Sequence, residues 1–212
     1  MLNPERLRLI VITDGRLAAP RSIVEVIRSA VDAGAPAIQL RAKSSTAREM
    51  AEVGHRLRDI TTRAGALLFV NDRFDVAMAI GADGVHVGPD DIPVAALRRA
   101  APPGFLIGSS TDDPGEASRL VAEGADYIGC GTVYPTSTKS DAGESIGLDG
   151  LQAVVDAVDV PVVGIGGIDE RGAREIAERT TAAGVAAIGA VMRAEDPGRT
   201  VASLLYPFQQ PR

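Results

Sequence analysis

The sequence is poor in cysteine and histidine: its 212 residues include one cysteine, Cys130, and two histidines. A lone cysteine excludes an internal disulfide framework, and so few Cys and His residues exclude a zinc-binding cluster. No apolar run approaches the ~20 residues that a membrane-spanning helix needs, so no membrane partner is expected. Pro4 and Glu5 precede the first short apolar run, which is untypical of a secretory signal, and we expect a cytoplasmic protein.

Basic residues are also in the minority, with 22 Lys and Arg against 28 Asp and Glu and a formal net charge of −6. Nucleic acids and anionic membranes require a broad basic face, so neither is expected as a partner. A small anionic substrate held by a few local cations remains compatible with this charge. The composition does not specify an oligomeric state.

The remaining composition, 45% hydrophobic and 24% charged, is typical of a globular protein, and the length suits one domain over residues 1–212. Short apolar runs recur along the chain and predict strands that are buried on both faces, as in a parallel sheet. The eight runs are Leu9–Thr13, Ala37–Leu40, Ala66–Val70, Gly84–Val87, Phe105–Gly108, Tyr127–Cys130, Val160–Ile165 and Val185–Val191.

Between these runs, apolar residues at spacings of three and four, as at Ile23, Val26 and Ala30, predict amphipathic helices. Glycine after four of these segments predicts left-handed helix caps: Ala33-Gly34, Ala64-Gly65, Glu123-Gly124 and Ala183-Gly184. Eightfold alternation of strand and helix predicts an α/β fold, a (β/α)8 TIM barrel. The alternative, a doubly wound open sheet that binds a dinucleotide, lacks its GxGxxG motif after the first strand.

Barrel enzymes carry their sites at the C-terminal ends of the strands, so polar residues at those points are candidates. Gln39 and Arg41 share one face of the second strand, because Ile38 and Leu40 must pack outward under the helices. Lys43 follows directly. A planar guanidinium and a compact ammonium together suit a phosphate or pyrophosphate.

Acidic loops follow the third and fourth strands, with Asn71-Asp72 in one and Asp90-Asp91 in the other. Each pair alone is compatible with a helix cap. Together, at one mouth of the barrel, they are suited to hold one hard cation, and Mg²⁺ typically takes one or two carboxylates plus substrate phosphates. His86, in the fourth strand, is more typical of a buried, hydrogen-bonded histidine than of a catalyst.

Hydroxyl and glycine residues follow the later strands. Ser110, after the fifth strand, is a candidate hydrogen-bond donor to a phosphate oxygen, or alternatively a helix cap. Gly166 follows the seventh strand and Ile188-Gly189 the eighth, where barrels commonly bind phosphate through backbone N–H groups. The loop after the sixth strand offers three hydroxyls and a cation to an anion: Thr136, Ser137, Thr138 and Lys139. The pattern predicts one substrate with a pyrophosphate and a metal, and another with a monophosphate.

Five segments together resemble the thiamine phosphate synthase family, and the resemblance extends over nearly the whole chain. The segments are QLRAK, FVNDRFDVAMAIGADGVHVGPDDIP, IGSS, DYIGCGTVYPTSTKSD and PVVGIGGI. The resemblance implies a (β/α)8 barrel and a transferase. Its reaction would join 4-amino-5-hydroxymethyl-2-methylpyrimidine diphosphate to 4-methyl-5-(2-phosphoethyl)thiazole, releasing thiamine phosphate and pyrophosphate by a dissociative, Mg²⁺-assisted substitution.

The resemblance also implies roles for individual residues. The pyrimidine diphosphate would be held by Gln39, Arg41, Lys43, Asn71, Ser110 and Lys139, of which Arg41, Ser110 and Lys139 would stabilise the leaving pyrophosphate. Mg²⁺ would be bound by Asp72 and Asp91. The thiazole phosphate would face Thr136, Ser137, Thr138, Gly166, Ile188 and Gly189.

Three positions depart from the family pattern. Ile10 stands where an aromatic residue is usual, Pro89 where a glutamine is usual, and Gly189 where a serine is usual, so a hydroxyl contact to the thiazole phosphate is lost. Two alternatives therefore remain. One is an isomerase like the related thiazole tautomerase, although Thr132 stands where that enzyme carries its catalytic histidine. The other is a non-catalytic phosphate-binding barrel.

Lys139→Ala is expected to lower turnover by about 10²–10³-fold, the usual loss when one preorganised donor to developing negative charge is removed. The measurement is the rate of pyrophosphate release with both substrates. Turnover within about tenfold of the parent enzyme would remove Lys139 from the mechanism.

Overall fold

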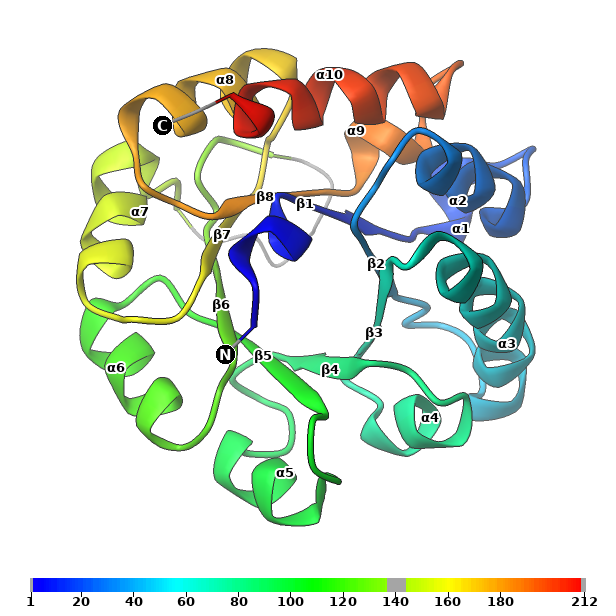
Figure 1. Ribbon diagram of the computed structural model, residues 1–212, viewed down its shortest axis with the longest axis horizontal. Coiled ribbons are helices and arrows are strands. Elements are labelled where there is room, and N and C mark those ends of the chain that lie inside the picture. Colours follow the sequence, from blue (N-terminus) through cyan, green and yellow to red (C-terminus); the bar gives the residue numbers. More distant parts are fainter. Residues whose placement is uncertain (1, 137–143, 211–212) are drawn as a thin grey trace.

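Eight parallel strands close into a barrel in the computed structural model, which describes residues 2–136 and 144–210. Each strand pairs with its neighbours in sequence order, and β8 closes the ring by pairing with β1, where Val185 lies opposite Leu9 (Figure 1). The strands are β1 Leu9–Ile12, β2 Ala37–Leu40, β3 Leu67–Asn71, β4 Gly84–Val87, β5 Leu106–Ser110, β6 Tyr127–Cys130, β7 Val162–Ile165 and β8 Gly184–Ala187. The predicted (β/α)8 barrel is confirmed.

The helices form a ring around the barrel (Figure 1), and the 3-10 helix η1 lies across one end of it. Their bounds are η1 Pro4–Leu7, α1 Gly15–Ala18, α2 Ile23–Asp32, α3 Ala47–Ala64, α4 Phe74–Ala79, α5 Val94–Ala100, α6 Pro114–Ala122, α7 Gly147–Asp156, α8 Glu170–Arg179, α9 Gly189–Met192 and α10 Pro197–Gln209.

The barrel is stabilised by a core on both sides of the sheet. Ile38 and Leu40 of β2 are fully buried, as is Leu57 of α3, and burial of an apolar side chain of this size contributes about 1.5–3 kcal/mol. Gln39, between the two outward residues, lines a cavity at the mouth of the barrel instead. The alternation expected for β2 is therefore confirmed.

Two sequence-based expectations about the last strand are wrong. The run expected as a strand over Val185–Val191 ends at Ala187, because Ile188 turns the backbone to φ −111° and ψ −80° and the chain enters α9. Gly184 is not a left-handed cap but the first residue of β8, and a Cβ there would lie 2.2 Å from the Leu7 carbonyl oxygen. The other three expected cap glycines do have positive φ: Gly34, Gly65 and Gly124.

A repeated ion pair ties neighbouring strands together. Asp83, just before β4, accepts hydrogen bonds from Arg58 of α3 and from the backbone N–H of Leu68 in β3, both at 2.7 Å. Asp126, just before β6, accepts in the same way from Arg98 of α5 at 2.5 Å and from a backbone N–H of β5 at 2.7 Å. Each aspartate thus joins the strand it precedes to the previous strand, and to the helix that comes before that previous strand in the chain.

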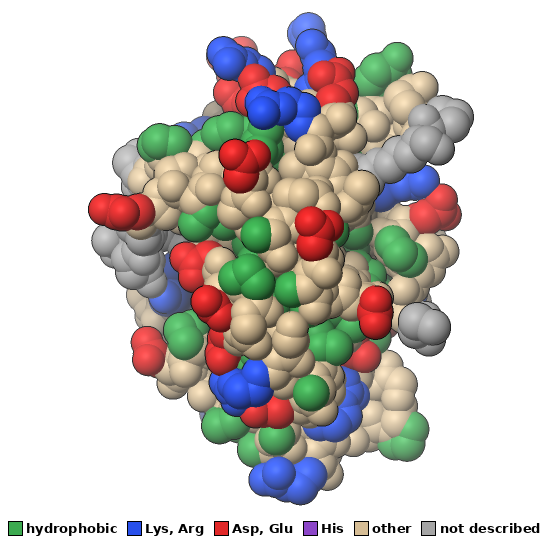
Figure 2. Space-filling model, turned by 90° about the vertical axis from the view of Figure 1, so that its left-hand side faces the viewer, with side chains coloured by type: hydrophobic (Ala, Val, Ile, Leu, Met, Phe, Trp, Pro, Cys, Tyr) green, Lys and Arg blue, Asp and Glu red, His purple; other side chains and the backbone are tan. Residues whose placement is uncertain are grey.

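On the outer surface, Figure 2 shows acidic and basic side chains interspersed on the side of the molecule that carries α7, with hydrophobic side chains scattered among them. Within the described ranges, no helix has both the length and the apolar character needed to cross a membrane.

Asp126→Ala removes the acceptor of a backbone N–H and of the Arg98 guanidinium together. We expect the free energy of unfolding to fall by about 1–3 kcal/mol, the usual cost of leaving such polar groups without a partner, in urea denaturation. Asp126→Asn keeps one acceptor oxygen and should lose less. Asp59→Ala, at an exposed position of α3, is the control; equal losses for Asp59 and Asp126 would contradict the prediction.

Candidate active site

A cavity of about 820 Å³ lies at the C-terminal ends of the barrel strands and is lined by residues from all eight of them. This is the end at which the sequence analysis placed the candidate site. Parallel strands in a closed barrel bring the residues that follow them to one mouth, so side chains distant in sequence meet there.

Arg41 is held in the cavity wall by the end of β1. The Thr13 hydroxyl accepts from the Arg41 backbone N–H at 2.8 Å and donates to the Arg41 carbonyl oxygen at 3.0 Å. The Arg41 guanidinium lies 3.8 Å from the carboxylate of Asp14, which also caps α1. These contacts fix a cation at the mouth before any substrate binds.

Asp72 and Asp91 follow the neighbouring strands β3 and β4, both line the cavity, and their carboxyls share a hydrogen bond. Asp91 is anchored by the backbone N–H of Gly88, which donates to its carboxylate at 2.8 Å. Asp72 has φ +62°, a left-handed conformation unusual for a residue other than glycine. Such backbone strain concentrates at functional sites, where surrounding structure over-determines it.

Electrostatics confirm that the two carboxyls are crowded. Burial, then the hydrogen bond and the negative charge of Asp91, raise the pKa of Asp72 to about 6, while Lys43 and Arg41 oppose the rise. Neither carboxylate is a helix cap: α4 begins after Arg73 without a side-chain cap, and α5 begins after Pro93. A cation between the two carboxylates would relieve their repulsion.

On the opposite side, glycines form the cavity wall. Gly166 and Gly167 follow β7 with φ +100° and +64°, and a Cβ on Gly167 would lie 2.7 Å from the carbonyl oxygens of Tyr134 and Pro135. The Tyr134 N–H donates to the Gly166 carbonyl at 3.1 Å, so the loops after β6 and β7 pack directly on each other. Backbone N–H groups can approach an anion closely at such a wall.

Ser110 is the last residue of β5, and its hydroxyl oxygen lies 2.8 Å from Nε2 of His86. The other ring nitrogen of His86, Nδ1, lies 2.9 Å from the Tyr127 hydroxyl. The alternative of a helix cap is wrong for Ser110, because Asp113 caps α6. His86 is a partly buried, hydrogen-bonded histidine, as the sequence indicated.

The structure brings together every expected site residue that it describes. Those lining the cavity are Gln39, Arg41, Lys43, Asn71, Asp72, Asp91, Ser110, Thr136, Gly166, Ile188 and Gly189. Ser137, Thr138 and Lys139 lie outside the described residues. The clustering places these side chains at one mouth, and their individual roles stay predictions.

Sequence reasoning missed other residues of the cavity. Tyr127 was expected only as the start of a strand, although it lines the cavity. Arg193 is exposed on the rim, one turn after Gly189, and its guanidinium has no hydrogen-bond or ion-pair partner among the described residues. Its position four residues after the predicted phosphate-binding glycine is the signal that would have found it.

The closed barrel, with cations and carboxylates on one side of its mouth and a glycine wall on the other, has the design of a (β/α)8-barrel enzyme for phosphorylated substrates. More particularly, the chain belongs to the thiamine monophosphate synthase family, whose family model matches residues 9–191.

Individual relatives agree with this assignment. The chain is 48% identical over 191 residues to a thiamine-phosphate synthase of Pyrococcus furiosus, covering 90% of this chain and 89% of that protein. It is 47% identical over 189 residues to a thiamine-phosphate synthase of Chloroflexus aurantiacus, covering 89% and 87%. A solved thiamine phosphate pyrophosphorylase from Pyrococcus furiosus superposes with a TM-score of 0.88 at 43% identity, covering 97% of each chain.

The raised pKa of Asp72 predicts a pH dependence of stability. Because the folded-state pKa of about 6 exceeds the ordinary value of 3.8, the folded state binds this proton more tightly, and stability falls as pH rises through that window. Asp72→Asn removes the cost of burying a charge and the repulsion by Asp91, and asparagine suits a left-handed backbone.

We therefore expect Asp72→Asn to melt at a higher temperature than the parent at about pH 7.5 in a chelator, with the difference shrinking near pH 4. Differential scanning calorimetry measures both. A variant that melts below the parent at both pH values would show that the Asp72 carboxylate stabilises the fold.

Proposed function

We propose that this chain is a thiamine-phosphate synthase that joins 4-amino-5-hydroxymethyl-2-methylpyrimidine diphosphate to 4-methyl-5-(2-phosphoethyl)thiazole. One observation carries the proposal: a single cavity presents a cation-and-carboxylate side and, apart from it, a glycine-walled side. That division suits two phosphorylated substrates, one of which leaves a pyrophosphate behind. Family membership and the relatives above support the same reaction.

The diphosphate substrate is assigned to the side of β2 to β5. Arg41 and Lys43 supply positive charge, and Arg41 is already oriented by Thr13 and Asp14. Gln39, Asn71 and Ser110 would donate or accept hydrogen bonds at the strand ends. A cation in a fixed position stabilises developing negative charge without reorganisation at the moment of reaction.

Mg²⁺ is assigned to Asp72 and Asp91, whose crowded carboxyls fit a divalent cation. Within residues 2–136 and 144–210, no group of three or more His, Cys, Asp or Glu side chains is placed to hold a metal. Mg²⁺ is usually bound by one or two protein carboxylates, and substrate phosphates and water complete its coordination shell. When bound there, the ion would neutralise charge on the departing pyrophosphate.

The bond between the pyrimidine methylene carbon and the pyrophosphate oxygen breaks first, with its electron pair leaving on the oxygen. The thiazole nitrogen then forms the new bond to that carbon with its lone pair. Arg41, Ser110 and Lys139 would contact the leaving group, whose charge grows in the transition state, so they stabilise that state more than the bound substrate. Departure needs no general base, and both ring nitrogens of His86 are already hydrogen-bonded.

The thiazole phosphate is assigned to the wall formed by Gly166, Ile188 and Gly189, with Thr136 beside it. Gly189 contributes a backbone N–H but no hydroxyl. Ser137 and Thr138 are expected at the same phosphate and lie outside the described residues. This wall faces the carboxylate side across the cavity, which suits a thiazole nitrogen directed at the pyrimidine carbon.

The proposed function is tested by pyrophosphate release with both substrates, with Mg²⁺ or with a chelator, and with the thiazole phosphate omitted. Release that needs Mg²⁺ and both substrates supports the synthase and the metal assignment together. No release from folded protein would overturn the proposal. Isomerisation of the thiazole would then identify a tautomerase, and binding without turnover a non-catalytic barrel.

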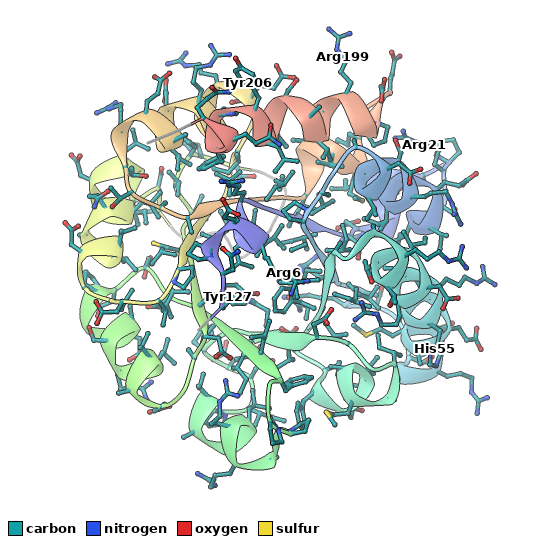
Figure 3. All side chains as sticks on the ribbon, viewed as in Figure 1. Arg6, Arg21, His55, Tyr127, Arg199 and Tyr206 are labelled. Carbon is teal, nitrogen blue, oxygen red and sulfur yellow. The ribbon has the colours of Figure 1, made fainter. Side chains whose placement is uncertain are left out.

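Arg193→Ala should raise KM for the thiazole phosphate about 3–10-fold and leave kcat nearly unchanged, because one exposed cation next to Gly189 would be lost from the phosphate wall. Steady-state kinetics with each substrate varied in turn measure the effect. Arg199→Ala on the outer helix α10 is the matched control (Figure 3). A rise in KM for the diphosphate instead would place Arg193 with the other substrate.

A further inference from the structure

We infer that His86 is a positioning residue, which holds the Ser110 hydroxyl so that its hydrogen is directed to the diphosphate substrate. The inference deepens the proposed function, on which the identity of that substrate rests. It follows from a line of side chains across the barrel interior, Gln39, Tyr127, His86 and Ser110, which we call the polar chain.

The polar chain is continuous. Gln39 hydrogen-bonds the Tyr127 hydroxyl. The Tyr127 oxygen lies 2.9 Å from Nδ1 of His86, and Nε2 of His86 lies 2.8 Å from the Ser110 oxygen. Tyr127 is fully buried, Gln39 is 3% exposed, and both line the inner end of the cavity. Figure 3 shows Tyr127 among the side chains inside the barrel.

The protons of the polar chain have one consistent direction. Burial raises the pKa of Tyr127 far above its ordinary value, so the phenol keeps its hydrogen. In the inferred direction the Tyr127 O–H donates to Nδ1 of His86, 2.9 Å away. A neutral imidazole that accepts at Nδ1 carries its hydrogen on Nε2 and donates it to Ser110.

Ser110 is the end of the polar chain and the beginning of the substrate contacts. Its oxygen accepts from His86, and no other described residue hydrogen-bonds it. Its one hydrogen is therefore available to an acceptor in the cavity that Ser110 lines. Hydrogen bonds in a line polarise one another, so each earlier bond of the polar chain strengthens the hydrogen bond that Ser110 donates to the substrate.

The backbone leaves space for the polar chain. In the strand register, Gly108 of β5 lies between His86 and Tyr127, and Gly129 of β6 lies opposite Ser110. A Cβ on Gly108 would lie 2.2 Å from Tyr127 Cζ, and a Cβ on Gly129 would lie 2.9 Å from His86 Cε1. Both distances are shorter than a real contact between non-bonded atoms. The rings of His86 and Tyr127 therefore meet only because these two strand positions have no side chain.

The tautomer is the first test and does not depend on catalysis. Nitrogen-15 NMR of the histidine side chains resolves two residues, and His55→Gln on the outer helix α3 removes the other signal. We expect His86 with a protonated Nε2 and an unprotonated Nδ1. Tyr127→Phe should shift the Nδ1 resonance by removing its donor. A hydrogen on Nδ1 instead would overturn the direction of the polar chain.

The second test asks whether His86 acts through Ser110. Pyrophosphate release is measured for the parent, Ser110→Ala, His86→Asn and the double variant. We expect His86→Asn to lower kcat about tenfold in the parent, the order of one lost hydrogen bond, but less than about twofold when Ser110 is already alanine. Equal losses in both backgrounds would overturn the inference, and His55→Asn should lose nothing.

Two further measurements keep the inference testable. If His86→Asn does not fold, Tyr127→Phe takes its place in the same double-variant comparison with Ser110→Ala, because Tyr127→Phe preserves the buried ring. Binding of inorganic pyrophosphate with Mg²⁺, measured by calorimetry for the same four proteins, separates the inference from the proposed function. Coupled losses of affinity without any turnover would retain the polar chain and reject the synthase, whereas additive losses would reject the polar chain.

Discussion

Closure of eight short parallel strands in one continuous register is the constraint on which the remaining structure depends. In a closed ring every strand has two neighbours, so each residue has a set inward or outward direction, and all C-terminal ends meet at one mouth. The outward residues of β2 are buried under helices, while Gln39 between them reaches the cavity. A shift of one residue in this register would exchange the two sets and abolish both core and site.

The same register sets the electrostatics of the mouth. Asp72 and Asp91 follow neighbouring strands. Burial, and then the nearby Asp91 carboxyl, raise the pKa of Asp72, which has a backbone conformation that aspartate rarely adopts. Arg41 is held on the same side of the mouth by Thr13 and Asp14. Charges that are crowded without substrate are suited to bind a cation and a diphosphate, because binding relieves the repulsion that folding left in place.

The expectations from sequence were correct for those residues whose direction or backbone conformation depends on the local sequence pattern. Alternation placed Gln39 and Arg41 correctly at the cavity, and three of the four glycines expected as left-handed caps have positive φ. The expectations failed at β8, where an apolar run continued past the strand into α9. An apolar run of this length has the same composition in a strand and in a buried helical turn, so only packing separates the two.

The sequence by itself determined the barrel, the mouth at which the site lies and most of the residues around it, because strand alternation, glycine caps and polar residues at strand ends are local properties. Only the tertiary structure decided that His86 and Tyr127 meet across Gly108, that Arg193 reaches the rim, and that Asp72 is crowded by Asp91. These contacts join residues from different strands and loops, and their distances depend on how the ring closes rather than on any one segment.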